Sequence, residues 1–281
     1  MLKFWDFIEI GTCDFDTEIQ KNDNKIGISV EPLEYYLEKL PTKPGCIKVN
    51  SAVSNYKGSM TMYYIPEETI RKNYLPLWVK GCNSVNKRHA NVRSILKQHC
   101  LDINSLTVSC KVECTTLINL MEQYYTCGLY YLKIDTEGHD LIILEHFLKN
   151  VKNNAYLPHK ILFESNNLIS VKEKRKVLML AAEKGYIVEY SSKDTLLKLN
   201  LNKLQNKSMF SEKIKNYVIK RCPPNYDVEN LPHENNLESA QQYCIKNNFS
   251  GVVYTKGNYE VRCGNFLFYD DEQECCSWIF L

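Results

Sequence analysis

Residues Leu132–Asp140 read LKIDTEGHD, an apolar strand pattern followed directly by four ionisable side chains around one glycine. A buried strand needs no such cluster, whereas active sites collect acids and histidines where strands end. The alternative interpretation is a solvated loop in which an aspartate caps the next helix. We favour the first interpretation, which makes Asp135, Glu137 and His139 candidate catalytic residues.

Strand and helix patterns alternate outward from this motif over the first 200 residues. Apolar or alternating runs predict strands at 4–10, 25–30, 46–49, 59–65, 130–134 and 160–163, and helical periodicity predicts helices at 32–40, 142–148 and 172–184. Two further runs, 186–190 and 195–199, predict an antiparallel hairpin that closes the sheet. Strands separated by helices indicate an α/β fold, a doubly wound and mostly parallel sheet with helices on both faces.

Ligands of doubly wound sheets bind beyond the carboxyl ends of the strands, so the residues there are candidate ligand contacts. The first strand ends in the segment that carries Glu9, Gly11, Thr12 and Asp14, where the glycine permits a tight turn. A lone glycine does not make the GxGxxG dinucleotide motif, and the acids favour a cationic or hydroxyl-bearing ligand. Glu31 ends the second strand 20 residues after Gly11, where an acid can hold ribose hydroxyls. Each piece alone also fits an ordinary strand-to-helix turn.

Taken together, these segments resemble the FkbM family of S-adenosylmethionine-dependent methyltransferases. The matching segments are 7–17 (FIEIGTCDFDT), Val30–Pro32, Asn50–Ser54, Thr115–Leu117, 132–139 and Phe163–Ser165. They cover roughly residues 5–200 in the right order. The resemblance implies the seven-stranded class I methyltransferase fold, with the hairpin as its last two strands. It also implies methyl transfer to a hydroxyl, often on a sugar.

The resemblance assigns a role to each strand end. It implies that the cofactor S-adenosyl-L-methionine is bound by Glu9, Gly11, Thr12, Asp14, Glu31, Pro32, Ala52 and Val53. Glu31 would hold the ribose, and Ala52 and Val53 would lie near adenine. Asp135, Glu137 and His139 would face the transferring methyl group. His139 suits a catalytic base at neutral pH, Asp135 and Glu137 are the alternatives, and we assign Glu164 to the acceptor hydroxyl.

A basic insert of about residues 66–107 interrupts the sheet pattern. Within it, Thr69–Leu101 contains no Asp or Glu but carries seven Lys and Arg. One interpretation is a lid for an acceptor with phosphate or acid groups, with Arg88 and Arg93 as substrate-binding residues. Basic residues interleaved with aromatics also fit a nucleic-acid surface. A solvated helix at 87–100 is the simplest alternative.

The charge balance changes near the end of the chain. Residues 222–281 hold three Lys and Arg against nine Asp and Glu, while the whole chain has a net charge of +2. The proline-marked segment 222–225 therefore indicates a boundary between an FkbM-like domain, 1–221, and a small acidic module, 222–281. A helix at 238–246 and strands at 251–254, 259–262, 266–269 and 278–281 predict an α+β module.

The module has two alternative roles: a stabilising or dimerising appendage, or a glycan-binding unit. Four of its cysteines could form disulfides, namely Cys244, Cys263, Cys275 and Cys276. Disulfides form in oxidising compartments, so the cytoplasmic location that we predict disfavours this pairing. Residues 1–10 carry acids and no cleavage signal, and no apolar run reaches 18 residues, so we expect a cytoplasmic protein without membrane association. The near-neutral charge makes a nucleic-acid partner an unfavoured interpretation.

The sequence therefore predicts an S-adenosyl-L-methionine-dependent O-methyltransferase acting on a sugar or glycan hydroxyl. One alternative is an NAD-dependent nucleotide-sugar oxidoreductase, which shares the strand-end acid but requires more glycines. Another is a non-catalytic cofactor-binding relic with a glycan-binding module. The cluster of Asp135, Glu137 and His139 argues against this alternative. We expect no metal requirement. Asp135, Glu164 and Asn166 are the alternative Mg²⁺ ligands.

Overall fold

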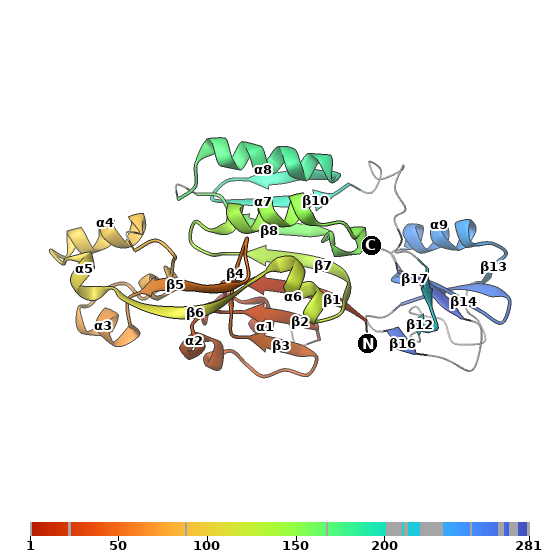
Figure 1. Cartoon of the computed structure of the whole chain (residues 1–281), viewed down its shortest axis with the longest axis horizontal. Coiled ribbons are helices and arrows are strands. Elements are labelled where there is room, and N and C mark those ends of the chain that lie inside the picture. The colour runs from red at the N-terminus through yellow and green to blue at the C-terminus, as the bar shows by residue number, and fades with distance from the viewer. Residues whose placement is uncertain are drawn as a thin grey trace.

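A seven-stranded sheet forms the centre of the computed structural model (Figure 1). The structure describes residues 2–21, 24–87, 89–166, 168–200, 210, 213–219, 233–247, 249–263, 267–269 and 275–279. Across the sheet the strands are β3 (Cys46–Val49), β2 (Gly27–Val30), β1 (Lys3–Ile10), β7 (Thr126–Ile134), β8 (Lys160–Glu164), β10 (Asp194–Leu199) and β9 (Tyr186–Ser191). The first five strands are parallel, and β10 is antiparallel to both β8 and β9. The predicted sheet with its closing hairpin is confirmed.

Helices cover both faces of this sheet. The helices α6 (Leu117–Gln123), α7 (Asp140–Asn150) and α8 (Val171–Glu183) share the main core with one face, where Ile8 is fully buried. The short helices α1 (Glu18–Lys21) and α2 (Glu34–Lys39) pack around Phe7 in a separate core. Because adjacent residues of a strand point to opposite faces, Phe7 and Ile8 place these two helix layers on opposite sides. A one-turn 3₁₀ helix, η2 (Asn154–Tyr156), precedes β8.

A second sheet lies beside the carboxyl ends of the central strands, in the order β4 (Ala52–Ser54), β6 (Val108–Thr116) and β5 (Gly58–Tyr64). The sequence analysis predicted a strand at 59–65, which is β5, but assigned no strand to Ala52–Ser54 or Val108–Thr116. The pairing of these three strands into a second sheet is therefore an addition to the prediction. Between β5 and β6 lie the helical segments α3 (Glu67–Lys72), η1 (Leu77–Gly81), α4 (Ala90–Gln98) and α5 (Ile103–Leu106). They enclose their own apolar core at one end of the molecule (Figure 1).

The C-terminal part forms a small α+β unit, as its sequence pattern predicts. A five-stranded sheet contains β11 (Ile214–Lys215), β17 (Cys276–Ile279), β14 (Gly251–Thr255), β15 (Asn258–Arg262) and β13 (His233–Glu234), and a two-stranded sheet contains β12 (Tyr217–Ile219) and β16 (Leu267–Tyr269). The helix α9 (Leu237–Asn247) packs on β14 and β15. The predicted boundary at 221–222 lies outside the described residues.

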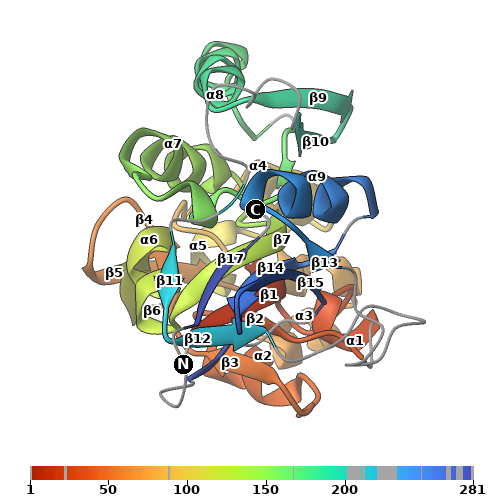
Figure 2. The same cartoon turned by 90° about the vertical axis from the view of Figure 1, so that its right-hand side faces the viewer.

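This unit packs against the beginnings of β1 and β7. Val253 and Ile279 form one apolar cluster with Cys127, Leu2 and Phe4. The strands β14 and β17 accordingly lie near the start of β1 in Figures 1 and 2. The strand β1 is eight residues long, so the unit lies roughly 25 Å from the carboxyl ends at about 3.3 Å per residue. No helix among the described residues is long and apolar enough to cross a membrane.

Candidate functional site

Two adjoining pockets open at the carboxyl ends of β1, β2 and β7. The first, here called the apolar pocket, has walls of Ile10, Pro32, Ala52, Val53, Met60 and Met62. The second, here called the acidic pocket, contains Asp16, Asp135, Glu137 and Glu164. Gly11, Cys13, Gly81 and Asp135 line both pockets. A ligand in the first pocket therefore lies next to one in the second.

Gly11 allows the ends of β1 and β7 to meet. Its φ is +80°, a left-handed conformation that other residues rarely adopt. A Cβ at this position would lie 1.9 Å from the carbonyl oxygen of Asp135. The Asp135 amide donates a hydrogen bond of 2.9 Å to the Ile10 carbonyl oxygen across the same junction. The missing side chain thus places Asp135 in the wall shared by both pockets.

Glu31 is buried at the end of β2 and faces the apolar pocket. Its carboxylate accepts backbone hydrogen bonds from Cys13 (2.8 Å) and Leu33 (2.9 Å). Burial raises the pKa of Glu31 to about 7, against the opposing effect of these two bonds. A carboxylate has about four acceptor positions, so Glu31 retains capacity for hydroxyl donors of a ligand.

The other predicted residues of the first loop have different positions. Glu9 lies beneath the loop, where it accepts hydrogen bonds from the Glu18 amide (2.5 Å), the Ile19 amide (3.1 Å) and the Ser29 hydroxyl (2.5 Å). Glu9 therefore fixes the start of α1 to β2, and it lines neither pocket. Thr12 lines the acidic pocket. Asp14 forms ion pairs with Lys39 (3.3 Å) and Lys80 and so joins the first loop to the insert.

Hydrogen bonds to Asp140 hold the loop after β7 in place. This fully buried carboxylate accepts hydrogen bonds from the Thr136 amide (3.1 Å) and hydroxyl (2.7 Å) and from the Glu164 amide (3.0 Å). It therefore connects the ends of β7 and β8, a role that the sequence analysis missed. An acid at the first position of a helix after a polar strand end was the available signal.

Burial raises the pKa of three carboxyl groups around this loop. The pKa of Asp135 rises to about 6 and that of Asp140 to about 7. The pKa of Glu164 rises to about 9, because burial is reinforced by the charges of Glu137, Asp140 and Asp135. One oxygen of Glu164 is buried without a hydrogen-bond partner among the described residues, while Asn166 donates to the other.

His139 faces the apolar pocket. Its Nε2 lies 2.8 Å from the Ser54 hydroxyl oxygen at the end of β4. Burial lowers the pKa of His139, so the ring is neutral at physiological pH. The predicted catalytic set is therefore divided: His139 lies beside the apolar pocket, Asp135 is shared, and Glu137 and Glu164 belong to the acidic pocket.

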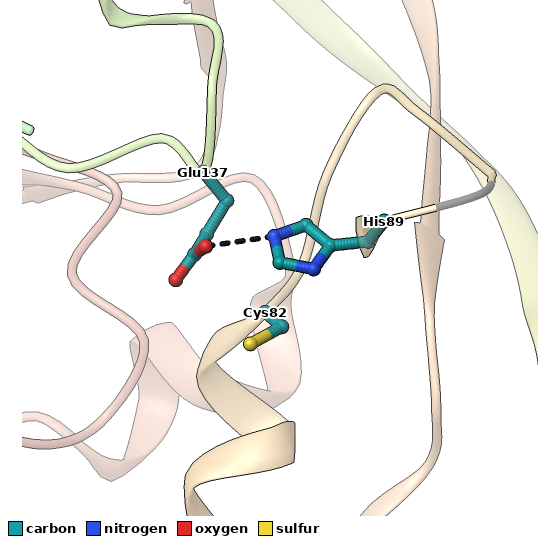
Figure 3. Close-up of side chains that lie close together, drawn as sticks. All are labelled: Cys82, His89 and Glu137. Carbon is teal, nitrogen blue, oxygen red and sulfur yellow. Dashed lines mark hydrogen bonds and ion pairs between the residues drawn. The ribbon is translucent and has the colours of Figure 1, made fainter. Parts of the chain in front are cut away.

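Glu137 contacts the insert through His89, which lies beside Cys82 (Figure 3). The three donor atoms lie within 4.8 Å of one another, a spacing compatible with a metal site. However, His89 Nδ1 accepts a hydrogen bond of 3.4 Å from the Val92 amide, so the ring proton belongs on Nε2. That proton is donated to Glu137 at 2.8 Å. We therefore interpret the group as a hydrogen-bonded pair that joins α4 to the loop after β7.

The insert also contributes residues that the sequence analysis did not assign to a site. Trp78 of η1 and Asn91 of α4 line the acidic pocket, and Asn83 and Val85 line the apolar one. Arg93 is exposed on α4 and lines neither pocket. Arg88, the second predicted substrate-binding residue, lies outside the described residues. The alternation of Met60 and Met62 on β5 was a signal for the pocket wall.

The strand order, the closing hairpin and the ligand pockets at the carboxyl ends define a class I methyltransferase fold. A family model described as the methyltransferase FkbM domain matches residues 9–188, well over half of the 281 residues. The chain therefore belongs to the FkbM methyltransferase family, as its resemblance predicted. Neither the curated proteins nor the solved structures gave a significant match.

Proposed function

We propose that this methyltransferase uses S-adenosyl-L-methionine to methylate a hydroxyl of a sugar or glycan. The observation that carries the proposal is the shared wall at Asp135, where an apolar and an acidic pocket adjoin. The lining of the first pocket suits a nucleoside, and the hydrogen-bonding groups of the second suit a polyhydroxylated acceptor. The cofactor supplies an electrophilic methyl group, and the chain must orient the acceptor and take up its proton.

The apolar pocket has the chemistry that an adenosyl group requires. Met60, Met62 and Val53 offer apolar faces to a flat base. Glu31 offers carboxylate oxygens to ribose hydroxyls at the end of β2. At Gly11 the absence of a side chain permits a close approach to the backbone. These features support cofactor binding by Gly11, Glu31, Pro32, Ala52 and Val53.

Asp135 is the group best placed to accept the acceptor proton. It lies in the wall of both pockets, and its pKa of about 6 leaves it mainly ionised at neutral pH. His139 is the other candidate base, since burial lowers its pKa and keeps the ring neutral, but its Nε2 is engaged with Ser54. The geometry therefore favours Asp135 as the base and gives His139 a part in the cofactor wall.

Calorimetry tests the cofactor assignment. We expect S-adenosylhomocysteine to bind and NAD not to bind. Glu31→Ala should weaken binding by about 1.5–3 kcal/mol, the usual value of hydrogen bonds to a charged group. Glu38→Ala on α2 is the control, because Glu38 is exposed and lines neither pocket. Binding of NAD, or equal affinity in the Glu31 and Glu38 variants, would contradict the assignment.

Turnover with a glycoside acceptor tests the base. Asp135→Asn should still bind S-adenosylhomocysteine, while its kcat should fall by about 10²–10⁴-fold. In the parent, kcat/KM should rise with pH through about 6, the pKa of Asp135. His139→Ala should instead weaken cofactor binding. The assignment is wrong if Asp135→Asn turns over at the parental rate.

A further inference from the structure

The acidic pocket is lined by charges of one sign. Its four carboxylates are Asp16, Asp135, Glu137 and Glu164, and no Lys or Arg among the described residues lines it. Asp16 is balanced by Lys21 at 2.8 Å and by Lys133 at 3.8 Å. Asp135 and Glu137 carry less compensation, while Glu164 is protonated at neutral pH because its pKa is raised to about 9. The excess of negative charge in the pocket therefore comes from Asp135 and Glu137.

The carboxylate oxygens of Asp135, Glu137 and Glu164 lie within 4.8 Å of one another. Lys133 approaches only Asp135, at 4.0 Å, and His89 donates to Glu137. A bound S-adenosyl-L-methionine adds a net single positive charge, which offsets at most one of them. The second oxygen of Glu164 has no hydrogen-bond partner among the described residues, so it can pair with a hydroxyl group of a ligand.

Four basic residues of the insert form ion pairs elsewhere or are exposed to solvent. Lys80 forms an ion pair with Asp14, and Arg71 pairs with Glu67 at 2.5 Å. Arg93 and Lys97 are exposed on α4. None of these four cations lines the acidic pocket, so their positive charges are not directed at a ligand there.

Two aromatic rings complete the pocket. Phe15, after β1, is 43% exposed, and Trp78, in η1, is 45% exposed. Both line the acidic pocket, together with the amide side chain of Asn91. Aromatic faces combined with a few polar groups suit a ligand that has both an apolar face and hydroxyl donors. A sugar ring has this character.

Resting on the function proposed above, we infer that the acidic pocket selects the acceptor by charge. It accepts an uncharged or amino-bearing sugar and rejects one that carries a carboxylate or phosphate near the methylated hydroxyl. Hydroxyl and ammonium donors would pair with Asp135 and Glu137, whereas an anion would be repelled by both carboxylates. Phe15 and Trp78 would contact the ring without regard to its charge.

A charge series of glycosides with one ring skeleton tests this inference. The probes are the methyl glycosides of glucosamine, glucose and glucuronic acid, titrated into protein saturated with S-adenosylhomocysteine and followed by saturation-transfer NMR. We expect the glucosaminide to bind most tightly and the glucuronide at least about tenfold more weakly than the glucoside, because like charges repel at close range. Glu137→Gln should narrow this spread. Glu164→Gln should leave it nearly unchanged at neutral pH, because it replaces a group that is already protonated.

Two further variants separate the contributions. Trp78→Ala should weaken all three glycosides alike, and Lys97→Ala should leave the order unchanged, because Lys97 is an exposed cation outside the pocket. A glucuronide that binds as tightly as the glucosaminide would overturn the inference, as would the failure of all three sugars to bind. Failure of S-adenosylhomocysteine itself to bind would instead refute the proposed function, and the inference with it.

Discussion

Replacing Gly11 by alanine should disrupt the junction between β1 and β7. The new Cβ would lie 1.9 Å from the Asp135 carbonyl oxygen, more than about 1 Å inside ordinary contact distance. The neighbour is backbone and cannot turn away like a side chain. The strands must separate, and the hydrogen bond from the Asp135 amide to the Ile10 carbonyl then lengthens or breaks.

The expected loss in the free energy of unfolding is about 3–6 kcal/mol. A left-handed alanine costs about 1–2 kcal/mol. Overpacking of a buried contact costs about 1–3 kcal/mol, and a lost hydrogen bond about 1 kcal/mol. Since Asp135 lines both pockets, the variant should also lose affinity for S-adenosylhomocysteine.

Gly257 provides the matched control. It lies between β14 and β15 with a φ of +85°, and a Cβ there would meet nothing within 4 Å. Gly257→Ala should therefore show only the conformational cost of about 1–2 kcal/mol and unchanged cofactor affinity. Urea unfolding and calorimetry on both variants give the comparison. Equal destabilisation of the two variants would refute the steric explanation.

Three further predictions concern charge, metal and packing. From pH 7 to 9 the unfolded carboxyl group at position 164 is already ionised, while the folded one, with its raised pKa, loses its proton. The free energy of unfolding should therefore fall between pH 7 and 9. Glu164→Gln should reduce that fall by about 1 kcal/mol, a value discounted for solvent screening in the open pocket. Urea unfolding at the two pH values measures the difference. Turnover should survive EDTA treatment; loss restored by Mg²⁺ would recast Asp135, Glu164 and Asn166 as ligands. Phe147→Ala in α7, fully buried in the main core, should lower the free energy of unfolding by about 3–5 kcal/mol, and a loss under 1 kcal/mol would contradict the packing.

The central sheet was predictable because its signals are local. Each parallel strand is a short apolar run, and the carboxyl end of each carries polar residues, as at Asp135 and Glu31. The hairpin of β9 and β10 follows from two adjacent β-rich runs. Family motifs lie at these same ends, so the pocket containing Gly11, Glu31 and Ala52 was also predictable.

Two strands of the second sheet were missed, for physical reasons that differ between them. Ala52–Ser54 is only three residues long and is too short to show any periodicity. Val108–Thr116 does alternate, with apolar residues at 108, 110, 112 and 114, so its period of two was an available signal. The pairing of β5 with β6 spans the whole insert, and no local pattern specifies a contact at such separation.

The roles of individual acids were less predictable than their presence. Glu9 and Glu31 both end buried strands, yet Glu9 is engaged by α1 and Ser29 while Glu31 faces a pocket. The difference depends on the path of the loop after Gly11, which returns helix α1 beneath the strand ends. Likewise, Arg93 contributes positive charge to the sequence pattern, but its place on α4 directs it to solvent.

The acids at the strand ends also set a relation between ligand binding and stability. Burial raises the pKa of Glu31, Asp135 and Glu164, so ionising each of them at neutral pH opposes folding. Donors from a bound cofactor and acceptor would offset that cost, because they favour the ionised carboxylates. Bound ligands should therefore stabilise the folded protein, because they pair with the carboxyl groups whose ionisation destabilises the ligand-free protein. The C-terminal unit packs at the other end of β1, and none of its described residues lines either pocket.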